Sequence, residues 1–389
     1  MPKVAVIGAG PAGSACAARL ASRGLDVTLF ERTPFPRTKV CGEYLNAAAQ
    51  RELMELAAGD TVIQHCNRVA GIRLHVDGTA LELPFANPAW TIARSRLDEI
   101  LFARARDAGA QPILARVEDI ERIADRIRIR FRDASGLERR FEADAVVGAD
   151  GLGSLVARKC GLARDGRRRG RFALGGHYSG FGPLDGFIEM YVTKDAYFAI
   201  NPLGEELANV MVVVEESDLH RWTGAIDRNL QKTASHLAAG KRGIPNVQRV
   251  GKRVAIGPLA HEVRDVAAPS VYLAGDAAGF IDPFTGQGVF LALRSASLVA
   301  SAVEAQLTQT ESQERAALRY CREHRRIFHS RARVARLVSL LVKTPWLSRR
   351  ALHNLQRSAD LRRTVMAVIS GQEQPQEPLN AAMMLRLVA

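Results

Sequence analysis

The apolar positions near the start of the chain form two short runs separated by a segment with helical spacing. Residues 3–7 are almost wholly apolar, as in the strands of a parallel sheet that is buried on both faces. A helix is expected next, in GSACAARLASRGL, and a second strand in DVTLFE, which ends at Glu31. This order of strand, turn, helix and strand predicts a βαβ unit.

Further along the chain, strand-like and helical patterns alternate in blocks. Alternating positions predict strands within residues 68–90, 113–120, 126–132, 145–148 and 171–216, and a buried strand at 271–275. Helical spacing predicts helices at residues 46–58, 94–110, 219–239 and 288–307, and then to about residue 370, with GQEQPQEP as a polar linker or frayed end.

These blocks predict an α/β protein: a Rossmann-type nucleotide-binding domain with an inserted, mostly antiparallel substrate-binding sheet and a C-terminal helical region. The nucleotide-binding parts are expected at residues 1–67, 91–165 and 266–310. The inserted sheet is expected at residues 68–90 and 166–265. Residues 311–389 form the expected basic helical region.

Composition is that of a globular protein, because 47% of the 389 residues are hydrophobic and 24% are charged. The five cysteines are scattered without a CxxC pair, which argues against a disulfide framework or a zinc site and predicts no metal. No secretory leader and no uninterrupted apolar run of spanning length is evident, so a cytoplasmic location is expected.

The net charge of +13 is concentrated in one stretch. Residues 311–363 contain 13 Arg and one Lys against three Glu and one Asp, a balance of 14 − 4 = +10. Three interpretations stay open: contact with a membrane surface, favoured by the apolar run VARLVSLLVKTPWL, docking of an acidic carrier protein, or a solvated helical cap. A peripheral membrane location is therefore an option, whereas nucleic acid is not expected, because no recognition motif accompanies the charge.

Gly8, Gly10 and Gly13 form a G-x-G-x-x-G motif directly after the first strand, and Pro11 and Ala12 open the helix. Such a turn lets a pyrophosphate approach the backbone at the positive end of the helix dipole. The carboxylate of Glu31 at the end of the second strand is suited to a ribose 2′-hydroxyl. The bound nucleotide is therefore expected to be FAD or NAD.

Two further motifs favour FAD. Asp150 and Gly151 follow a strand in the sequence ADGLGS, and a second buried strand delivers Asp276 to the loop GDAAGFIDPFTGQG. A carboxylate there can bind a ribityl hydroxyl, and the helix expected to begin at Gly288 can face the flavin edge that becomes anionic on reduction.

Together these motifs resemble the FAD-dependent oxidoreductases of the para-hydroxybenzoate hydroxylase fold, and within them the geranylgeranyl reductase family. The residues that carry the resemblance are GAGPAG, PRTKVCGEYL, Arg94–Asp98 as R-x-x-L-D, ADG at 149–151 and GDAAGFIDPFTGQG. They cover the flavin half of the chain and say little about the inserted sheet or the C-terminal helices.

The resemblance implies a set of flavin contacts. They are Ala12 and the glycine turn for the pyrophosphate, Glu31 and Arg32 for the adenosine, Arg94 for the pyrophosphate region, Val117 for the adenine, Asp276 for the ribitol, Cys41, Gly42 and Tyr44 for the ring edge, Pro283 and Gly286 for the loop beside the ring, and Gly288 and Val289 for its pyrimidine side.

The sequence departs from the family at two places. Ala157 stands where the hydroxylases often have an Arg. The prenyl reductases carry Tyr-x-Trp-x-Phe-Pro on the substrate sheet, and here Tyr197 and Pro202 remain, while Ala199 and Asn201 replace the two aromatic residues. A larger or more polar cavity is therefore expected around Tyr197, Ala199 and Asn201, which are candidate substrate contacts.

Four further side chains are candidates for chemistry. Cys41 could donate a proton beside the flavin or simply be a small buried thiol. Glu43 could be a proton donor or a carboxylate at a helix start. His177 and Tyr178 could bind the substrate and act as general acids, or could be structural.

Three functions are weighed. The first is an NAD(P)H-driven FAD monooxygenase of a lipophilic or aromatic molecule such as a polyketide or quinone, and the altered aromatic signature favours it. The second is a reductase of a carbon–carbon double bond in an isoprenoid or other unsaturated lipid. The third is a flavoprotein that modifies or chaperones another polypeptide.

Overall fold

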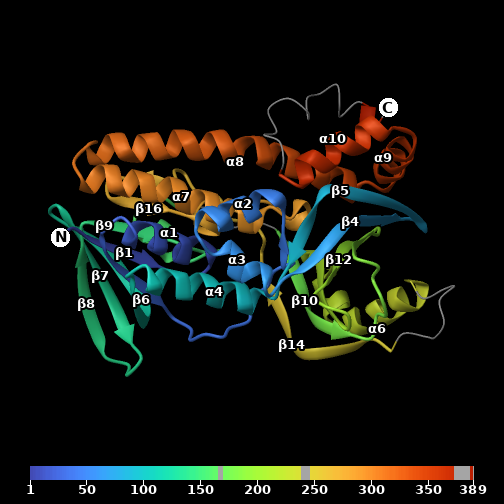
Figure 1. The fold of residues 1–389 in the computed structure, drawn as a ribbon, viewed down its shortest axis with the longest axis horizontal. Helices are drawn as coiled ribbons and strands as arrows, with labels where there is room; N and C mark the ends of the chain where they lie inside the picture. The colour runs from blue at the N-terminus through green and yellow to red at the C-terminus, as the bar shows by residue number, and fades with distance from the viewer. Residues whose placement is uncertain (165–169, 238–245, 372–385, 389) are drawn as a thin grey trace.

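The computed structural model describes residues 1–164, 170–237, 246–371 and 386–388. The chain forms two eight-stranded sheets, which lie toward opposite ends of the molecule in Figure 1. The expected boundary between residues 165 and 166 and most of the expected polar tail lie outside the described residues. The other domain boundaries stay predictions.

The first sheet has a parallel centre, as the early βαβ pattern predicts. In spatial order its strands are β15 (Ala267–Ala268), β16 (Val271–Leu273), β9 (Ala145–Gly148), β1 (Lys3–Ile7), β2 (Asp26–Glu31), β6 (Gln111–Ile123), β7 (Arg126–Asp133) and β8 (Glu138–Ala143). The strands from β16 to β6 run parallel, whereas β15, β7 and β8 pair antiparallel at the two edges.

Helices cover this sheet with small and apolar side chains. They are α1 (Pro11–Ala21), α4 (Arg94–Asp107), α5 (Leu155–Lys159), α7 (Gly288–Leu307) and α8 (Gln313–Lys343), and α2 (Ala47–Glu55) and α3 (Gly59–Ile63) lie beside them. In Figure 1, α7 and α8 run side by side along one long edge of the molecule.

Among the described residues, α7 is the one helix whose length and hydropathy would allow it to cross a membrane. It packs against α1, α2 and α8, and 61% of its most apolar window is buried. That burial is typical of the core helix of a globular domain.

The second sheet is mostly antiparallel, as expected for the inserted segments. Its strands are, in spatial order, β14 (Gln248–Ile256), β10 (Arg171–Ser179), β13 (Leu207–Glu215), β12 (Ala196–Pro202), β11 (Phe187–Val192), β4 (Asn67–Val76), β5 (Thr79–Thr91) and β3 (Tyr44–Leu45). Only β11 and β4 pair in parallel. The order joins segments that are far apart in the chain.

Different elements pack on the two faces of the second sheet. The short turn η1 (Glu216–Asp218) leads into α6 (Leu219–Leu237), which packs on one face through Trp222, Ile226 and Leu230. The opposite face meets the end of α8, then α9 (Pro345–Arg357) and α10 (Ala359–Ile369), and the turn η3 (Pro283–Thr285), which follows η2 (Gly275–Ala278).

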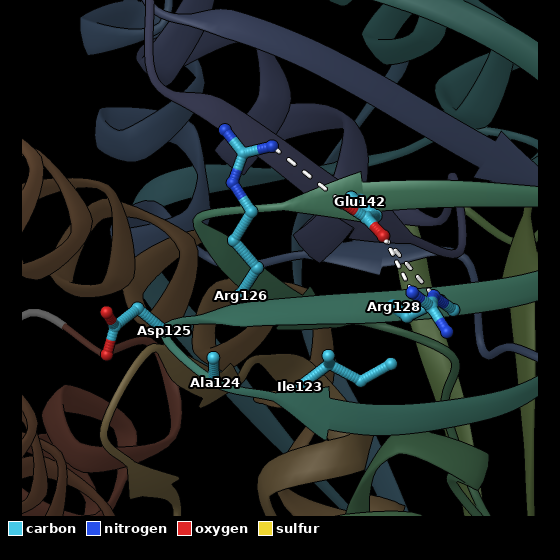
Figure 2. Close-up of a pocket in the computed structure, with 6 residues that line it drawn as sticks. All are labelled: Ile123, Ala124, Asp125, Arg126, Arg128 and Glu142. Atoms are coloured by element: carbon cyan, nitrogen blue, oxygen red, sulfur yellow. Dashed lines mark hydrogen bonds and ion pairs between the residues drawn. The ribbon is translucent and has the colours of Figure 1, made fainter.

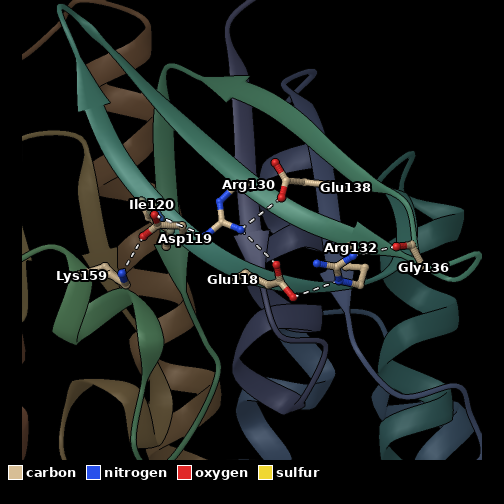
Figure 3. Close-up of polar contacts among 8 residues, drawn as sticks. All are labelled: Glu118, Asp119, Ile120, Arg130, Arg132, Gly136, Glu138 and Lys159. Carbon is tan, nitrogen blue, oxygen red and sulfur yellow. Dashed lines mark hydrogen bonds and ion pairs between the residues drawn. The ribbon is translucent and has the colours of Figure 1, made fainter.

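Four strands, β3, β8, β14 and β15, were not predicted. Strands β3 and β15 have two residues each, which is too short to give an alternating signal. Strand β14 is exposed along most of its length, so its sequence has no buried stripe that would give an alternating signal. Strand β8 is charged, and it is held to β7 by an exposed network of ion pairs. In Figure 3, Arg130 lies between Glu118 and Glu138, at 3.1 and 3.4 Å, and Arg132 contacts Glu118.

Candidate functional site

The glycine turn between β1 and α1 has the geometry that its motif predicts. Gly8 has a φ of +97°, and its N–H donates to the carbonyl of Phe30 at 2.8 Å. A Cβ on Gly13 would lie 1.7 Å from the carbonyl oxygen of Gly8, so any side chain there would push the helix off the strand. Gly10 caps α1 without a side-chain bond, which leaves the first N–H groups of the helix available to an anion.

Glu31 fixes the shape of this turn. Its carboxylate accepts hydrogen bonds from the N–H groups of Ala9 and Thr33, at 2.8 and 3.0 Å. The guanidinium of Arg37 lies 2.6 Å from Oε1 of Glu31, the oxygen that accepts from Thr33, and both Arg37 and Glu31 are buried. Each carboxylate oxygen can accept more than one hydrogen bond, so a sugar hydroxyl can still bind there.

Two guanidinium groups converge on Gly10. A Cβ on Gly10 would lie 3.8 Å from Nη2 of Arg94 and 3.9 Å from Nη2 of Arg37. Asp98, which is fully buried, holds both: its carboxylate lies 2.6 Å from Nε of Arg94 and 3.4 Å from Nη2 of Arg37. The R-x-x-L-D spacing thus places an acid one helical turn after its arginine, where it aims the guanidinium at the turn.

The family resemblance indicates Arg32 beside Glu31 as an adenosine contact and does not indicate Arg37. Arg32 is exposed, and its predicted role is untested. Arg37 is buried, and its guanidinium also lies over the ring of Phe35, 4.7 Å from the ring centre. Both arginines belong to the same Pro-rich loop, and nothing in its local pattern indicates which one turns inward.

Arg94 also faces Cys41 and Asp276. Burial opposes its charge, but Asp98 and Cys41 more than compensate and raise its pKa, so the guanidinium stays charged. Burial raises the pKa of Asp276, and Arg94 and His261 partly counteract this effect. Within the described residues no donor contacts the Asp276 carboxylate, which fits the ribityl hydroxyl that the sequence analysis assigned to it.

The loop after Asp276 leads to the predicted ring site. Pro283 begins η3, and Gly286 adopts a left-handed conformation with φ of +63° against the ring of Tyr44. Helix α7 begins at Gly288, as predicted, and Val289 is in its first turn. The hydroxyl of Tyr44 and the side-chain oxygen of Gln287 are buried without a hydrogen-bond partner among the described residues. The predicted contact between Tyr44 and the ring edge stays a prediction.

Asp150 has a structural role in this arrangement. Its carboxylate accepts from the hydroxyl of Ser154 and the N–H of Leu155, both at 2.6 Å, and so holds the start of α5. Gly151 adopts φ of +78° beside it. Val117 pairs with Phe131 in the hairpin of β6 and β7, and its predicted adenine contact stays a prediction.

The turn Cys41–Gly42–Glu43 joins the two sheets. Glu43 has a φ of +58°, and one carboxylate oxygen accepts from the N–H of Arg94, at the start of α4, at 2.6 Å. The other oxygen lies 2.8 Å from Nε2 of His177 on β10. Glu43 therefore is a helix-start carboxylate, but for α4 and not for the helix that follows it in the chain.

The hydrogen bond to Glu43 raises the pKa of His177, with burial as the opposing effect. Burial raises the pKa of the neighbouring Cys41 thiol, and Arg94 works in the opposite direction. At neutral pH both effects favour the protonated forms of His177 and Cys41 at one end of the second sheet.

Tyr178 does not share a face with His177, and of the two alternatives given for Tyr178 the structure supports the structural role. Successive residues of a strand point to opposite faces. Tyr178 is 1% exposed, and its hydroxyl donates to Asp227 of α6 at 2.8 Å. It therefore lies under α6, on the face away from the flavin turn.

The replacement of an aromatic residue by Asn201 does not enlarge a cavity, contrary to expectation. Asn201 is buried, and its amide donates to the carbonyl of Gly42 at 2.7 Å, so it ties β12 to the flavin turn and does not line an open space. Asn209 pairs with both His177 and Asn201 in register, and its buried side-chain oxygen has no partner among the described residues. No motif in the sequence marks Asn209 as a candidate.

Beyond the row formed by His177, Asn209 and Asn201, the same face of the second sheet is apolar. Tyr197 donates to Asp282 at 2.9 Å and packs edge-on against Phe284, while Ala199 is half-buried. The apolar face of the second sheet, as we call it, comprises Ile72, Leu74, Val76, Leu81, Leu83, Ala173, Ile188, Met190, Val192, Tyr197, Ala199, Met211 and Val213. Phe284, Val342, Leu352, Met366 and Ile369 pack onto it.

Two cavities lie elsewhere. One of about 320 Å³ lies at the turn between β6 and β7 and is lined by Ile123, Ala124, Asp125, Arg126, Arg128 and Glu142 (Figure 2). None of these is a candidate site residue. The other, of about 470 Å³, is a groove between one side of α8 and the loops at residues 261–266 and 278–282, so it borders the flavin loop.

The sequence matches the FAD binding domain family over residues 1–334. The menaquinone reductase of Mycobacterium tuberculosis is 29% identical over 315 residues, which cover 77% of this chain and 76% of that protein. The chloroplastic geranylgeranyl diphosphate reductase of Oryza sativa subsp. japonica is 27% identical over 331 residues, which cover 78% of this chain and 66% of that protein. A triple mutant of the flavin-dependent brominase Bmp2 has the same fold, with a TM-score of 0.83 at 19% identity over 99% of this chain and 97% of that one.

The glycine turn, the paired arginines and the unpartnered Asp276 fit the cofactor that this family binds. Bound FAD supplies two-electron redox chemistry at the junction of the two sheets. The chain belongs to the FAD binding domain family and is an FAD-dependent oxidoreductase.

Proposed function

We propose that this protein is an NAD(P)H-driven reductase that saturates a carbon–carbon double bond in a lipophilic, isoprenoid-bearing molecule. The observation that carries the proposal is the apolar face of the second sheet, which ends at Cys41 and at His177, where His177 is held by Glu43. A long apolar molecule would lie between that face and helices α8, α9 and α10, which pack onto it and would have to move apart to admit the molecule, with its reacting end at the flavin turn. The relatives named menaquinone reductase and geranylgeranyl diphosphate reductase support this substrate class.

The protein side of the reaction is the delivery of a proton. Saturation of a double bond takes up two electrons and two protons, which NAD(P)H and solvent supply overall. In protonated His177, Nε2–H donates to Glu43 and Nδ1–H remains for transfer. The thiol of Cys41, whose pKa burial raises, is the second proton source beside the same turn.

A monooxygenase is the second candidate, because half-buried Ala199 replaces a large aromatic residue and leaves room at the apolar face. The change at Asn201 no longer supports this candidate, since that amide is bound to Gly42.

Product analysis separates the two. The holoprotein is incubated with NADH or NADPH and either menaquinone or geranylgeranyl diphosphate, once anaerobically and once in air. The products are analysed by mass spectrometry. The reductase proposal expects a gain of two hydrogens in the isoprenoid chain without oxygen, which persists after any quinol has been reoxidised to the quinone, and a much slower reaction in Cys41→Ser and His177→Gln. A gain of one oxygen atom, only in air, would support the monooxygenase instead, and no product under either condition would contradict both.

A further inference from the structure

Helix α8 presents a long basic stripe to solvent. Arg322, Arg326, His329, Arg333, Arg336, Leu340 and Lys343 follow one another at alternating steps of four and three residues, and all are exposed. This spacing places them on one side of the helix. With a rise of about 1.5 Å per residue, this α8 stripe is about 32 Å long, and it carries no acidic residue.

The charges of the stripe are not neutralised within the molecule. Lys343 lies 2.7 Å from Glu215, but none of the stripe's arginines contacts an acidic side chain among the described residues. The hairpin of β6, β7 and β8 is different, because Arg128 contacts Glu142 (Figure 2) and Arg130 contacts Glu118 (Figure 3). The α8 stripe therefore presents positive charge to solvent that an external anionic surface would neutralise.

Large apolar side chains are exposed on or beside the stripe. Leu318, one turn before Arg322, is 61% exposed, Leu340 is 56% exposed, and Trp346, at the start of α9, is 61% exposed. A basic helix with exposed Leu and Trp residues is typical of an element that lies in the interface of an anionic membrane. Trp is favoured at that level because its ring is apolar and its N–H is polar.

We propose that the α8 stripe, with Leu318, Leu340 and Trp346, docks the protein flat on an anionic membrane surface. The opposite sides of the same helices carry Val342 and Leu352, which cover the apolar face of the second sheet. The 470 Å³ groove shares His329 and Arg336 with the stripe and borders the flavin loop. Docking would thus bring lipid close to the flavin loop. Binding of the α8 stripe to the membrane does not depend on the reaction proposed above.

Vesicle sedimentation of the full-length holoprotein tests the proposal. One set of vesicles is phosphatidylcholine, and the other is an equal mixture with phosphatidylglycerol. We expect binding to the anionic vesicles alone, weakened by added salt. At about 1 kcal/mol, or fivefold, per basic residue, Arg326→Glu/Arg333→Glu should reduce the partition coefficient at least about 30-fold. Leu340→Ser/Trp346→Ser should reduce it by about tenfold or more.

Matched substitutions control for a general loss of charge or of surface hydrophobicity. Leu137 at the tip of the β7–β8 hairpin is 56% exposed, like Leu340, and Arg106 and Arg140 are exposed arginines away from α8. Leu137→Ser and Arg106→Glu/Arg140→Glu should sediment as the unchanged protein does. FAD content and circular dichroism verify that every variant is folded.

Three results would overturn the proposal. They are failure of the unchanged protein to bind anionic vesicles, full binding by the stripe variants, and an equal loss in the control variants. Binding to an acidic acyl carrier protein without binding to vesicles would likewise reject the membrane and assign the stripe to a protein partner.

Discussion

Glu43 connects three segments at the scale of single residues. It lies in a turn before β3, binds the start of α4 through the N–H of Arg94, and binds β10 through His177. Its backbone has a left-handed conformation that disfavours a side chain, at a cost of about 1 kcal/mol or more. Such a conformation persists only where the surrounding contacts hold it, and here the same carboxylate holds the imidazole of His177 beside the flavin turn.

The pair of Glu43 and His177 predicts a pH dependence of stability. The pKa of His177 is raised in the folded protein, so its stabilising contribution is fully present below the ordinary value of 6.5 and is lost as the pH rises through the raised value. Urea denaturation of the unchanged protein and His177→Gln should therefore give a larger difference in unfolding free energy at about pH 6 than at about pH 9. Glu43→Gln should reduce that pH dependence, and a difference independent of pH would contradict the pairing.

The two arginines of the Pro-rich loop allow a matched comparison. Arg37→Gln leaves the buried carboxylates of Glu31 and Asp98 short of a partner, which should cost about 3 kcal/mol and weaken FAD binding at least tenfold. Arg32→Gln removes an exposed charge and should change stability by no more than about 0.5 kcal/mol. Denaturation and titration of the apoprotein with FAD measure both. Equal loss of FAD affinity in Arg32→Gln would restore Arg32 as the principal contact.

At the scale of elements, the first βαβ unit depends on how closely α1 approaches β1. Gly13→Ala would place a Cβ 1.7 Å from the carbonyl oxygen of Gly8, so helix and strand must separate. We expect a loss of about 1–3 kcal/mol in stability and little bound FAD.

A Gly→Ala substitution in α6 should have the opposite effect on stability. Gly224 is exposed in that helix, and a Cβ there would meet no atom within 4 Å. Gly224→Ala should therefore stabilise the protein by up to about 1 kcal/mol through helix propensity and leave FAD binding unchanged. Thermal unfolding and the absorbance of the purified flavoprotein compare the two variants, and similar behaviour would refute the close-approach argument.

At the scale of the whole molecule, the predicted FAD contacts come from segments between Gly8 and Val289. A ligand held by such distant segments stabilises their common folded state. Free FAD at about 100 times its dissociation constant should add about 2.7 kcal/mol and raise the melting temperature of the apoprotein. Flavin release and loss of circular dichroism should coincide in one transition. An early release of flavin, with the melting temperature unchanged, would indicate a site confined to one separable unit.

The sequence by itself determined the elements whose signals are local. The glycine turn, the first helix and the helix that begins at Gly288 follow from short patterns, because tight turns and buried parallel strands require particular residues at fixed spacings. The α/β class and the FAD motifs could be read in the same way. Exposed β14 and charged β8 could not, since neither has a buried stripe.

Only the tertiary structure decided which side chains meet. Alternation along β10 required His177 and Tyr178 to face opposite sides, but the position of α6 decided that Tyr178 is the buried one. Glu43 and His177 are 134 positions apart, and Arg37 is 61 from Asp98. Such pairings depend on strand order and loop paths, which are set by the packing of the whole chain and leave no periodic trace in any one segment.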